Sequence, residues 1–354
     1  MMLRVTSRGI LRRCVVFRVP LVRFYATDGS LNSFIPKSMP LGVDKTIETN
    51  IKSETNKLSK TLEKFWEKVD TCYNNQTNEY EVQLDGKTIK TPHGFPISIP
   101  KSKKQLAYLI KHEWANLPDL KIKTHSLPLT SITSRAIDLI NCQKQSINNP
   151  ELIAKVGKLD DIKYNLLRYF DTDTCLIFAT DKEYEGKLRK RQHELYLPLI
   201  KEYEDFFTQY GHQNGLLPSD DYKVTIESLD CQTDGLRGNE QSLTTQNIVL
   251  HWLNQLPIYD LIALEKAILT SKSFLCGISL LRSNVSDEKN MADIYQINKS
   301  NIDDYFHRTI EEIVELGNLE TIYQTNEWGE VEDTHDVDKV DWLRNLTSAA
   351  ILCH

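Results

Sequence analysis

One segment decides the fold class of this chain: Tyr80-Glu81-Val82-Gln83-Leu84-Asp85-Gly86-Lys87-Thr88-Ile89-Lys90-Thr91. Its first five residues alternate between apolar and polar side chains, which is the pattern of a strand with one buried face. Asp85-Gly86 is a preferred dipeptide for a two-residue hairpin turn, because both positions adopt positive φ. We therefore predict a β-hairpin in which 87–91 pairs with 80–84.

The flanking sequence extends this hairpin into a small α+β unit. Pro92-His93-Gly94 predicts a second turn, and 95–100 fits a short edge strand, where proline is tolerated. Residues 102–115 then change to helical spacing, with Ser102 as a candidate N-cap. Their apolar face carries Leu106, Leu109, Ile110 and Trp114. We predict an N-terminal α+β domain over 61–150, in which Trp114 has a structural role.

Beyond residue 150 almost every segment has helical periodicity. Predicted helices cover 185–210 (kinked or split at Pro198), 243–256, 259–282, 309–327 and 338–352. Residues 259–282 are apolar on all sides, which is typical of a central bundle helix. Residues 211–240 are polar and contain glycines, so we predict a surface loop there. The prediction for 151–354 is a C-terminal helical bundle domain.

Composition excludes several classes of protein. The chain of 354 residues has 43 Lys and Arg against 49 Asp and Glu, giving a net charge of -6, which argues against nucleic-acid binding. It is longer than the roughly 250–300 residues at which single cores stop growing, so two domains are expected. No apolar run reaches the length of about 18 residues that membrane insertion needs. The seven Cys are scattered without a CxxC pair, which indicates free thiols in a reducing compartment.

The N-terminus has the composition of a targeting signal. Residues 1–25 contain six Arg interleaved with apolar residues, and the first acidic residue is Asp28. This pattern predicts a mitochondrial matrix presequence that is cleaved near Ala26; the alternative is a basic arm that binds acidic surfaces. Removal of the six Arg would lower the net charge from -6 to about -12. Residues 26–60 are polar and predict a linker.

Catalytic motifs are weak throughout the sequence. It contains no GxxxxGK[ST], GxGxxG or GxSxG pattern. Asp171-Thr172-Asp173 resembles a metal-binding DxD of phosphotransfer enzymes, but a helix N-cap explains it more simply. His335-Asp336 resembles the core of a metal-dependent phosphohydrolase site, which would need further ligands from other helices. The simpler interpretation is an acidic first turn of a helix.

Glu320 is the most informative polar residue. On a helix over 309–327 it shares one face with Leu316, Leu319 and Tyr323, so it interrupts an apolar stripe. An unpaired buried carboxylate costs several kcal/mol. Glu320 therefore has either an internal basic partner or a place on an exposed interaction surface.

Taken in order, these patterns resemble the assembly chaperones for the alpha subunit of F1-ATPase. The motifs that carry the resemblance span roughly 62–352: Phe65-Trp66, Tyr80–Pro92, Glu113-Trp114, Leu127–Thr130, Ala136–Asp138, Phe170–Thr174, Arg191-Gln192 with Pro198, Tyr259–Leu261, Lys272-Ser273, Leu319-Glu320 with Tyr323-Gln324 and Trp328-Gly329, and Glu332–Asp336. No single motif is specific, but the ordered set is.

The resemblance implies a non-enzymatic, ATP-independent chaperone of the mitochondrial matrix, with no cofactor. Its partner would be the unassembled alpha subunit, which it protects from aggregation until the beta subunit replaces it. The implied fold is a small α/β sandwich followed by an orthogonal helical bundle. The resemblance assigns client binding to Glu320, Tyr323 and Gln324, and a folding role to Trp114.

Two features depart from the family pattern. Tyr196-Leu197-Pro198 stands where relatives often have Trp-Asp-Pro, and 211–240 and 286–306 look inserted. The alternatives to a chaperone are the phosphohydrolase centred on His335 and Asp336, and a structural subunit of a matrix complex.

Overall fold

The computed structural model describes residues 64–117, 126–145, 150–235, 237–297, 308–330 and 335–354. All of them belong to one compact unit, Leu58–His354. The predicted presequence 1–25 and the predicted linker 26–60 lie outside the described residues.

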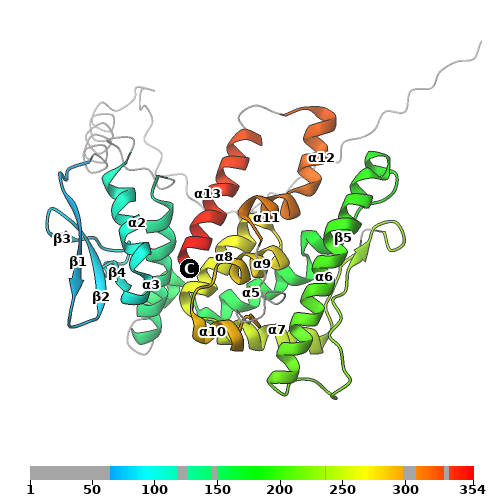
Figure 1. The fold of residues 1–354 in the computed structure, drawn as a ribbon, viewed down its shortest axis with the longest axis horizontal. Coiled ribbons are helices and arrows are strands. Elements are labelled where there is room, and N and C mark those ends of the chain that lie inside the picture. The colour runs from blue at the N-terminus through cyan, green and yellow to red at the C-terminus, as the bar shows by residue number, and fades with distance from the viewer. Residues whose placement is uncertain (1–63, 118–125, 146–149, 236, 298–307, 331–334) are drawn as a thin grey trace, which may run out of the picture. The chain divides into compact units, whose positions relative to one another are not determined.

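The predicted hairpin forms the centre of a small antiparallel sheet (Figure 1). Strand β2 (Glu79–Leu84) turns through Asp85 and Gly86, with φ of 49° and 79°, into β3 (Lys87–Thr88). Strand β1 (Val69–Asn74) pairs with β2 along its whole length, and β4 (Ser98–Pro100) also pairs with β2. β1 was not predicted, because polar Thr71 and apolar Cys72 are out of phase with the alternation of Val69 and Tyr73 with Asp70 and Asn74.

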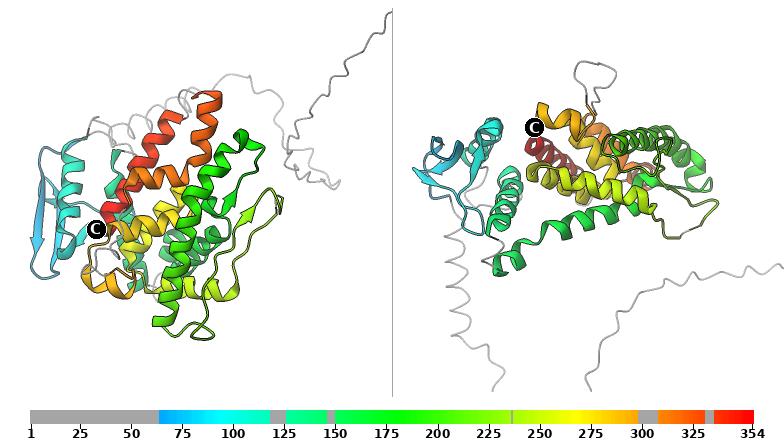
Figure 2. Two further views of the ribbon diagram at one scale, coloured as in Figure 1. Left: turned by 45° about the vertical axis from the view of Figure 1, so that its right-hand side comes forward. Right: turned by 90° about the horizontal axis from the view of Figure 1, so that it is seen from below.

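Helices α2 (Lys104–Ala115) and α3 (Pro128–Gln145) lie between this sheet and the remaining helices (Figures 1 and 2). The prediction of Ser102 as N-cap is wrong, since a 3-10 turn, η1 (Lys101–Lys103), precedes α2 and Lys103 holds the cap position without a side-chain bond. Leu106, Ile110 and Trp114 are buried as predicted, whereas Leu109 is 39% exposed. The α+β fold with a following helical bundle is confirmed; the domain boundary at residue 150 stays a prediction.

The helical bundle begins with α4 (Pro150–Val156) and α5 (Leu159–Asp171). Short elements η3 (Thr174–Leu176), β5 (Ile177–Phe178) and η4 (Glu183–Gly186) lead to α6 (Lys187–Gln213). After β6 (Leu229–Asp230) come α7 (Leu243–Gln255), α8 (Ile258–Ser271), α9 (Phe274–Asn284), α10 (Glu288–Asp293), α11 (Ile310–Gly317), α12 (Leu319–Trp328) and α13 (His335–Cys353).

Three helix predictions differ from the structure. Pro198 lies inside a continuous α6 and does not split it. The predicted helix 259–282 is two helices, because Lys272 adopts φ 57° and Ser273 then caps α9 by accepting a hydrogen bond from the Cys276 N–H. The predicted helix 309–327 is also two helices, which meet at Asn318.

The predicted surface loop 211–240 is only partly loop. Helix α6 continues to Gln213, and β6 pairs in parallel with β5. Between them Val224 and Ile226 are buried, although most of their neighbours are exposed. This segment is therefore anchored on the bundle by a few apolar side chains.

Helices α8 and α9 form the centre of the bundle, as their apolar sequence predicts. Gly277 in α9 allows their close approach, because a Cβ there would lie 2.8 Å from the Leu264 side chain. Helix α13 packs against α8 on another side, and α3 packs against both. Among the described helices, none has the length and apolar character needed to span a membrane.

Candidate functional site

The corner between α11 and α12 determines which side chains α12 exposes. Helix α11 starts in a capping box, in which Thr309 and Glu312 exchange hydrogen bonds. It ends at Gly317, where a Cβ would lie 3.0 Å from the Trp342 ring of α13. The missing side chain lets the end of α11 pack closely against α13, and the chain turns at Asn318 before α12 begins.

Because of this turn, Glu320 does not lie on a buried stripe. Leu316 and Leu319 are buried on either side of the corner, whereas the Glu320 side chain is exposed. The expected continuous face from Leu316 to Tyr323 is therefore wrong. Gln324 donates a hydrogen bond from Nε2 to the Glu320 Oε1 over 3.1 Å. None of the ion pairs found among the described residues involves Glu320.

Three aromatic rings cluster near the helix that carries this carboxylate: those of Tyr184 and Tyr323 are partly buried, and that of Trp328 is exposed. The Tyr184 ring lies 5.9 Å from that of Tyr323 and 6.1 Å from that of Trp328. Trp328 is 73% exposed, which is unusual for so large an apolar side chain. We define the aromatic–acidic patch as Tyr184 of η4 together with five residues of α12: Glu320, Tyr323, Gln324, Glu327 and Trp328.

The structure adds Tyr184 to the predicted residues. Tyr184 and Glu185 both adopt positive φ, 49° and 55°, which is strained for residues with a side chain. Burial raises the pKa of the Tyr184 phenol, and the carboxylates of Glu320 and Glu327 raise it further, whereas a hydrogen bond with Gln324 lowers it. The Tyr184 phenol therefore interacts electrostatically with both Glu320 and Glu327. No periodicity or motif in the sequence indicated this contact.

Trp114 lies in a different environment, at the junction of α2 and α3. Its ring packs edge-on against Trp66 at 5.0 Å, and its Nε1 donates a hydrogen bond to the Thr130 Oγ1 at 2.9 Å. The neighbouring Glu113 accepts hydrogen bonds from the backbone N–H groups of Leu129 (2.7 Å) and Thr130 (2.9 Å). The Glu113-Trp114 pair therefore holds the first turn of α3.

Asp173 also has a structural role. It is completely buried and accepts hydrogen bonds from the N–H groups of Cys175 and Leu275, each at 2.8 Å. Burial raises its pKa to about 6. Asp173 thus caps η3 and ties it to α9, which confirms the helix-cap interpretation of Asp171-Thr172-Asp173.

Comparison with known proteins identifies the family. A family model described as ATP12 chaperone protein matches residues 63–204. The mitochondrial ATP12 protein of Saccharomyces cerevisiae is 45% identical over 335 residues, covering 94% of both chains. The chain belongs to the ATP12 chaperone family. The mitochondrial atp12 protein of Schizosaccharomyces pombe is 32% identical over 292 residues, covering 82% of both chains.

Solved structures of this type share the fold. Atp12 from Paracoccus denitrificans superposes with a TM-score of 0.54 at 18% identity, covering 83% of this chain and 98% of that one. The Atu1473 protein of Agrobacterium tumefaciens gives a TM-score of 0.55 at 17% identity, covering 88% and 98%. At these identities the likeness concerns the fold alone.

Membership of a chaperone family confirms that the chain is not an enzyme, and it removes the support for a phosphohydrolase. The side chains of His335 and Asp336, on which that alternative depends, lie outside what the structure describes. Elsewhere in the described part of the chain, no cluster of three His, Cys, Asp or Glu side chains is arranged to hold a metal ion.

Proposed function

We propose that this chain is an ATP-independent chaperone that binds the unassembled alpha subunit of F1-ATPase through the aromatic–acidic patch. One observation carries the proposal: Glu320 is an exposed carboxylate on α12, the helix that also carries the exposed ring of Trp328, in a member of the ATP12 chaperone family. Glu320, Tyr323 and Gln324 would contact the client, and Tyr184 and Trp328 would extend the contact.

The chemistry of the patch suits such a client. A subunit that later buries a large surface against a neighbour must expose that surface beforehand, and it aggregates unless the surface is covered. Aromatic rings supply most of the contact energy in protein interfaces, whereas a carboxylate among them selects partners that offer a cation or a hydrogen-bond donor. The chaperone needs only to bind less tightly than the beta subunit in order to be displaced.

We further propose that the protein works in the mitochondrial matrix. Two relatives are named as mitochondrial proteins, and residues 1–25 have the composition of a matrix presequence. N-terminal sequencing of the protein purified from matrix should give a start near Ala26. Matrix protein that retained Met1 would contradict the presequence.

The function is tested by diluting denatured alpha subunit into buffer and following its light scattering. The chaperone at equimolar ratio should suppress scattering equally well with and without ATP. Glu320→Lys should abolish suppression, because like charges facing each other cost several kcal/mol, about a hundredfold or more in affinity. Glu240→Lys makes the same charge change at an exposed residue before α7 and should protect like the wild type.

Three outcomes would contradict the proposal. Suppression that required ATP would exclude an ATP-independent role, and equal suppression with an unrelated client would exclude specificity. A correctly folded Glu320→Lys protein that still protected the alpha subunit would remove the patch from the client interface.

A further inference from the structure

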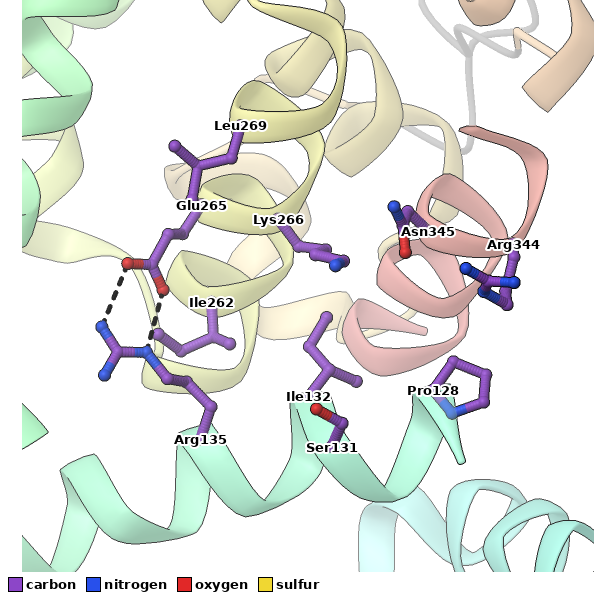
Figure 3. Close-up of a pocket in the computed structure, with 10 residues that line it drawn as sticks. All are labelled: Pro128, Ser131, Ile132, Arg135, Ile262, Glu265, Lys266, Leu269, Arg344 and Asn345. Carbon is purple, nitrogen blue, oxygen red and sulfur yellow. Dashed lines mark hydrogen bonds and ion pairs between the residues drawn. The ribbon is translucent and has the colours of Figure 1, made fainter. Parts of the chain in front are cut away.

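A groove lies between α3, α8 and α13, and none of its lining residues belongs to the aromatic–acidic patch. Its cavity volume is about 600 Å³, and its apolar lining includes Pro128, Ile132, Ile262 and Leu269. Figure 3 shows Ile132 and Ser131 rising from α3 toward α8, with Arg344 and Asn345 on the opposite wall. Leu269 is exposed and Pro128 is partly exposed, so these two apolar side chains are accessible to a partner, whereas Ile132 and Ile262 are buried.

The charged side chains of this groove are only partly paired within the protein; Arg344, for example, pairs with Asp341 of its own helix. Arg135 binds Glu265 through two hydrogen bonds of 3.1 and 3.3 Å, so this acid is neutralised within the protein. Lys266 extends from α8 into the groove (Figure 3). No hydrogen bond or ion pair to its ammonium group occurs among the described residues. Burial has the largest influence on the pKa of Lys266 and lowers it; the neighbouring Arg344 also lowers it, whereas Asp341 of α13, which is paired with Arg344, raises it.

A second hollow, of about 560 Å³, adjoins the first, since both are lined by Ser131 and Arg135. It adds the exposed Lys90 and Lys155. Its one acid, Asp138, is buried and accepts a hydrogen bond from the Thr91 hydroxyl. We call the two hollows together the α3 groove.

The α3 groove thus collects cations in a chain whose net charge is -6. Five Lys or Arg line it, namely Lys90, Arg135, Lys155, Lys266 and Arg344. Its two acids, Asp138 and Glu265, have partners inside the protein. Arg135 and Arg344 are paired with Glu265 and Asp341, so the excess of positive charge comes from the three Lys. An occupant that supplied carboxylates would balance these Lys, and its apolar residues would cover the exposed side chain of Leu269.

We propose that the α3 groove binds an acidic, apolar peptide segment of the client. This proposal rests on the proposed function, because it assumes that the chain holds an unassembled subunit. It gives the chaperone two contacts of opposite charge: the aromatic–acidic patch selects a cationic feature of the client, and the α3 groove selects an anionic one. Such complementarity fixes the orientation of the client on the chaperone.

The groove is tested with the full chain and a short fluorescent peptide composed of Glu, Leu and Ala. Fluorescence anisotropy should show that this peptide binds, whereas the same peptide with Lys at every Glu position should not. Lys266→Gln should weaken binding of the acidic peptide about tenfold. Ser131→Glu adds a negative charge at an exposed position of the lining and should abolish binding. Lys190→Gln removes an exposed charge on α6 and is the matched control.

The same variants are then tested for their ability to suppress light scattering by the denatured alpha subunit. We expect Ser131→Glu to protect the client less well than wild type while Lys190→Gln protects fully. Equal binding of the acidic and basic peptides, or undiminished binding by both groove variants, would overturn the proposal. Full protection by Ser131→Glu would exclude the client as occupant. A wild-type protein that failed to protect the alpha subunit would instead refute the proposed function, whatever the peptide result.

Discussion

Glu113 and Glu320 are chemically identical residues beside aromatic side chains, yet the fold uses them differently. The Glu113 carboxylate accepts hydrogen bonds from two backbone N–H groups and from the Thr130 hydroxyl, while Trp114 packs beside it on Trp66. The Glu320 carboxylate is exposed and accepts a hydrogen bond from Gln324, one turn along its own helix.

This difference separates a residue that stabilises the fold from a residue that is available to bind a partner. A carboxylate whose acceptors are filled from within the protein has little capacity left for a partner, so Glu113 serves the fold. A carboxylate that needs no neighbour for stability can be replaced without loss of the fold, so any effect of replacing Glu320 must come from binding. The comparison therefore predicts opposite responses to the same substitutions at the two sites.

The largest expected loss of stability follows from replacing Trp114. Trp114→Ala removes a buried ring that packs on Trp66 and donates a hydrogen bond to Thr130, so the free energy of unfolding should fall by about 3–5 kcal/mol. Chemical denaturation followed by tryptophan fluorescence or circular dichroism measures this loss. A variant with the wild-type midpoint would show that the ring contributes nothing to the α2–α3 junction.

A matched pair of charge reversals tests the comparison directly. Glu113→Lys replaces the acceptor of three hydrogen bonds with a cation at the N-terminus of α3, and it should cost about 3 kcal/mol. Glu320→Lys changes an exposed residue and should alter stability by no more than about 0.5 kcal/mol. Thermal denaturation measures the loss of stability of each variant relative to the wild type. Equal destabilisation of both variants would contradict the different roles assigned to the two glutamates.

The sequence predicted those parts of the fold that local chemistry determines. Asp85-Gly86 fixed the hairpin because the turn needs positive φ at both residues. Trp114 followed from helical spacing, and its burial agrees with the prediction. The weakly patterned strand β1 was missed because its place depends on pairing with β2, which is a tertiary interaction.

The candidate site was less predictable because it depends on where helices stop. Gly317-Asn318 is a visible breaker signal, yet the apolar periodicity continues across it, so the periodicity alone did not show that the helix ends there. The exposure of Glu320 follows from that break. Tyr184 reaches the patch from an irregular segment whose strained backbone has no sequence signature. The roles of Glu320, Tyr323 and Gln324 in client binding stay predictions.

A smaller effect should appear at Trp328, which tests whether the patch extends beyond Glu320. Trp328→Ala removes an exposed ring, so the melting temperature should stay at the wild-type value. If the client covers this ring, affinity for the alpha subunit should fall by about 2 kcal/mol, which is typical of an interface tryptophan. Titration of the labelled alpha subunit measures the change, and Leu243→Ala is a control at another highly exposed apolar residue. Unchanged affinity would confine the contact to the acidic part of the patch.

The smallest expected effect concerns the pH dependence of the buried carboxylate. Burial raises the pKa of Glu113 above its ordinary value of 4.5, and this cause outweighs the hydrogen bonds from Thr130 and Leu129, which lower it. The folded state therefore retains the proton to higher pH than the unfolded state does. The contribution of Glu113 to stability is fully present below the unfolded-state pKa and decreases as pH rises through the folded-state pKa.

Glu113→Gln isolates this contribution, because glutamine keeps a carbonyl acceptor but cannot ionise. The free energy of unfolding of the wild type minus that of Glu113→Gln should be larger at about pH 4 than at about pH 7.5. Urea denaturation at both pH values measures the difference, and other titrating groups cancel because both proteins contain them. A difference that was constant, or that grew with pH, would mean that the hydrogen bonds at α3 outweigh burial and that Glu113 acts as a charged cap in the folded protein.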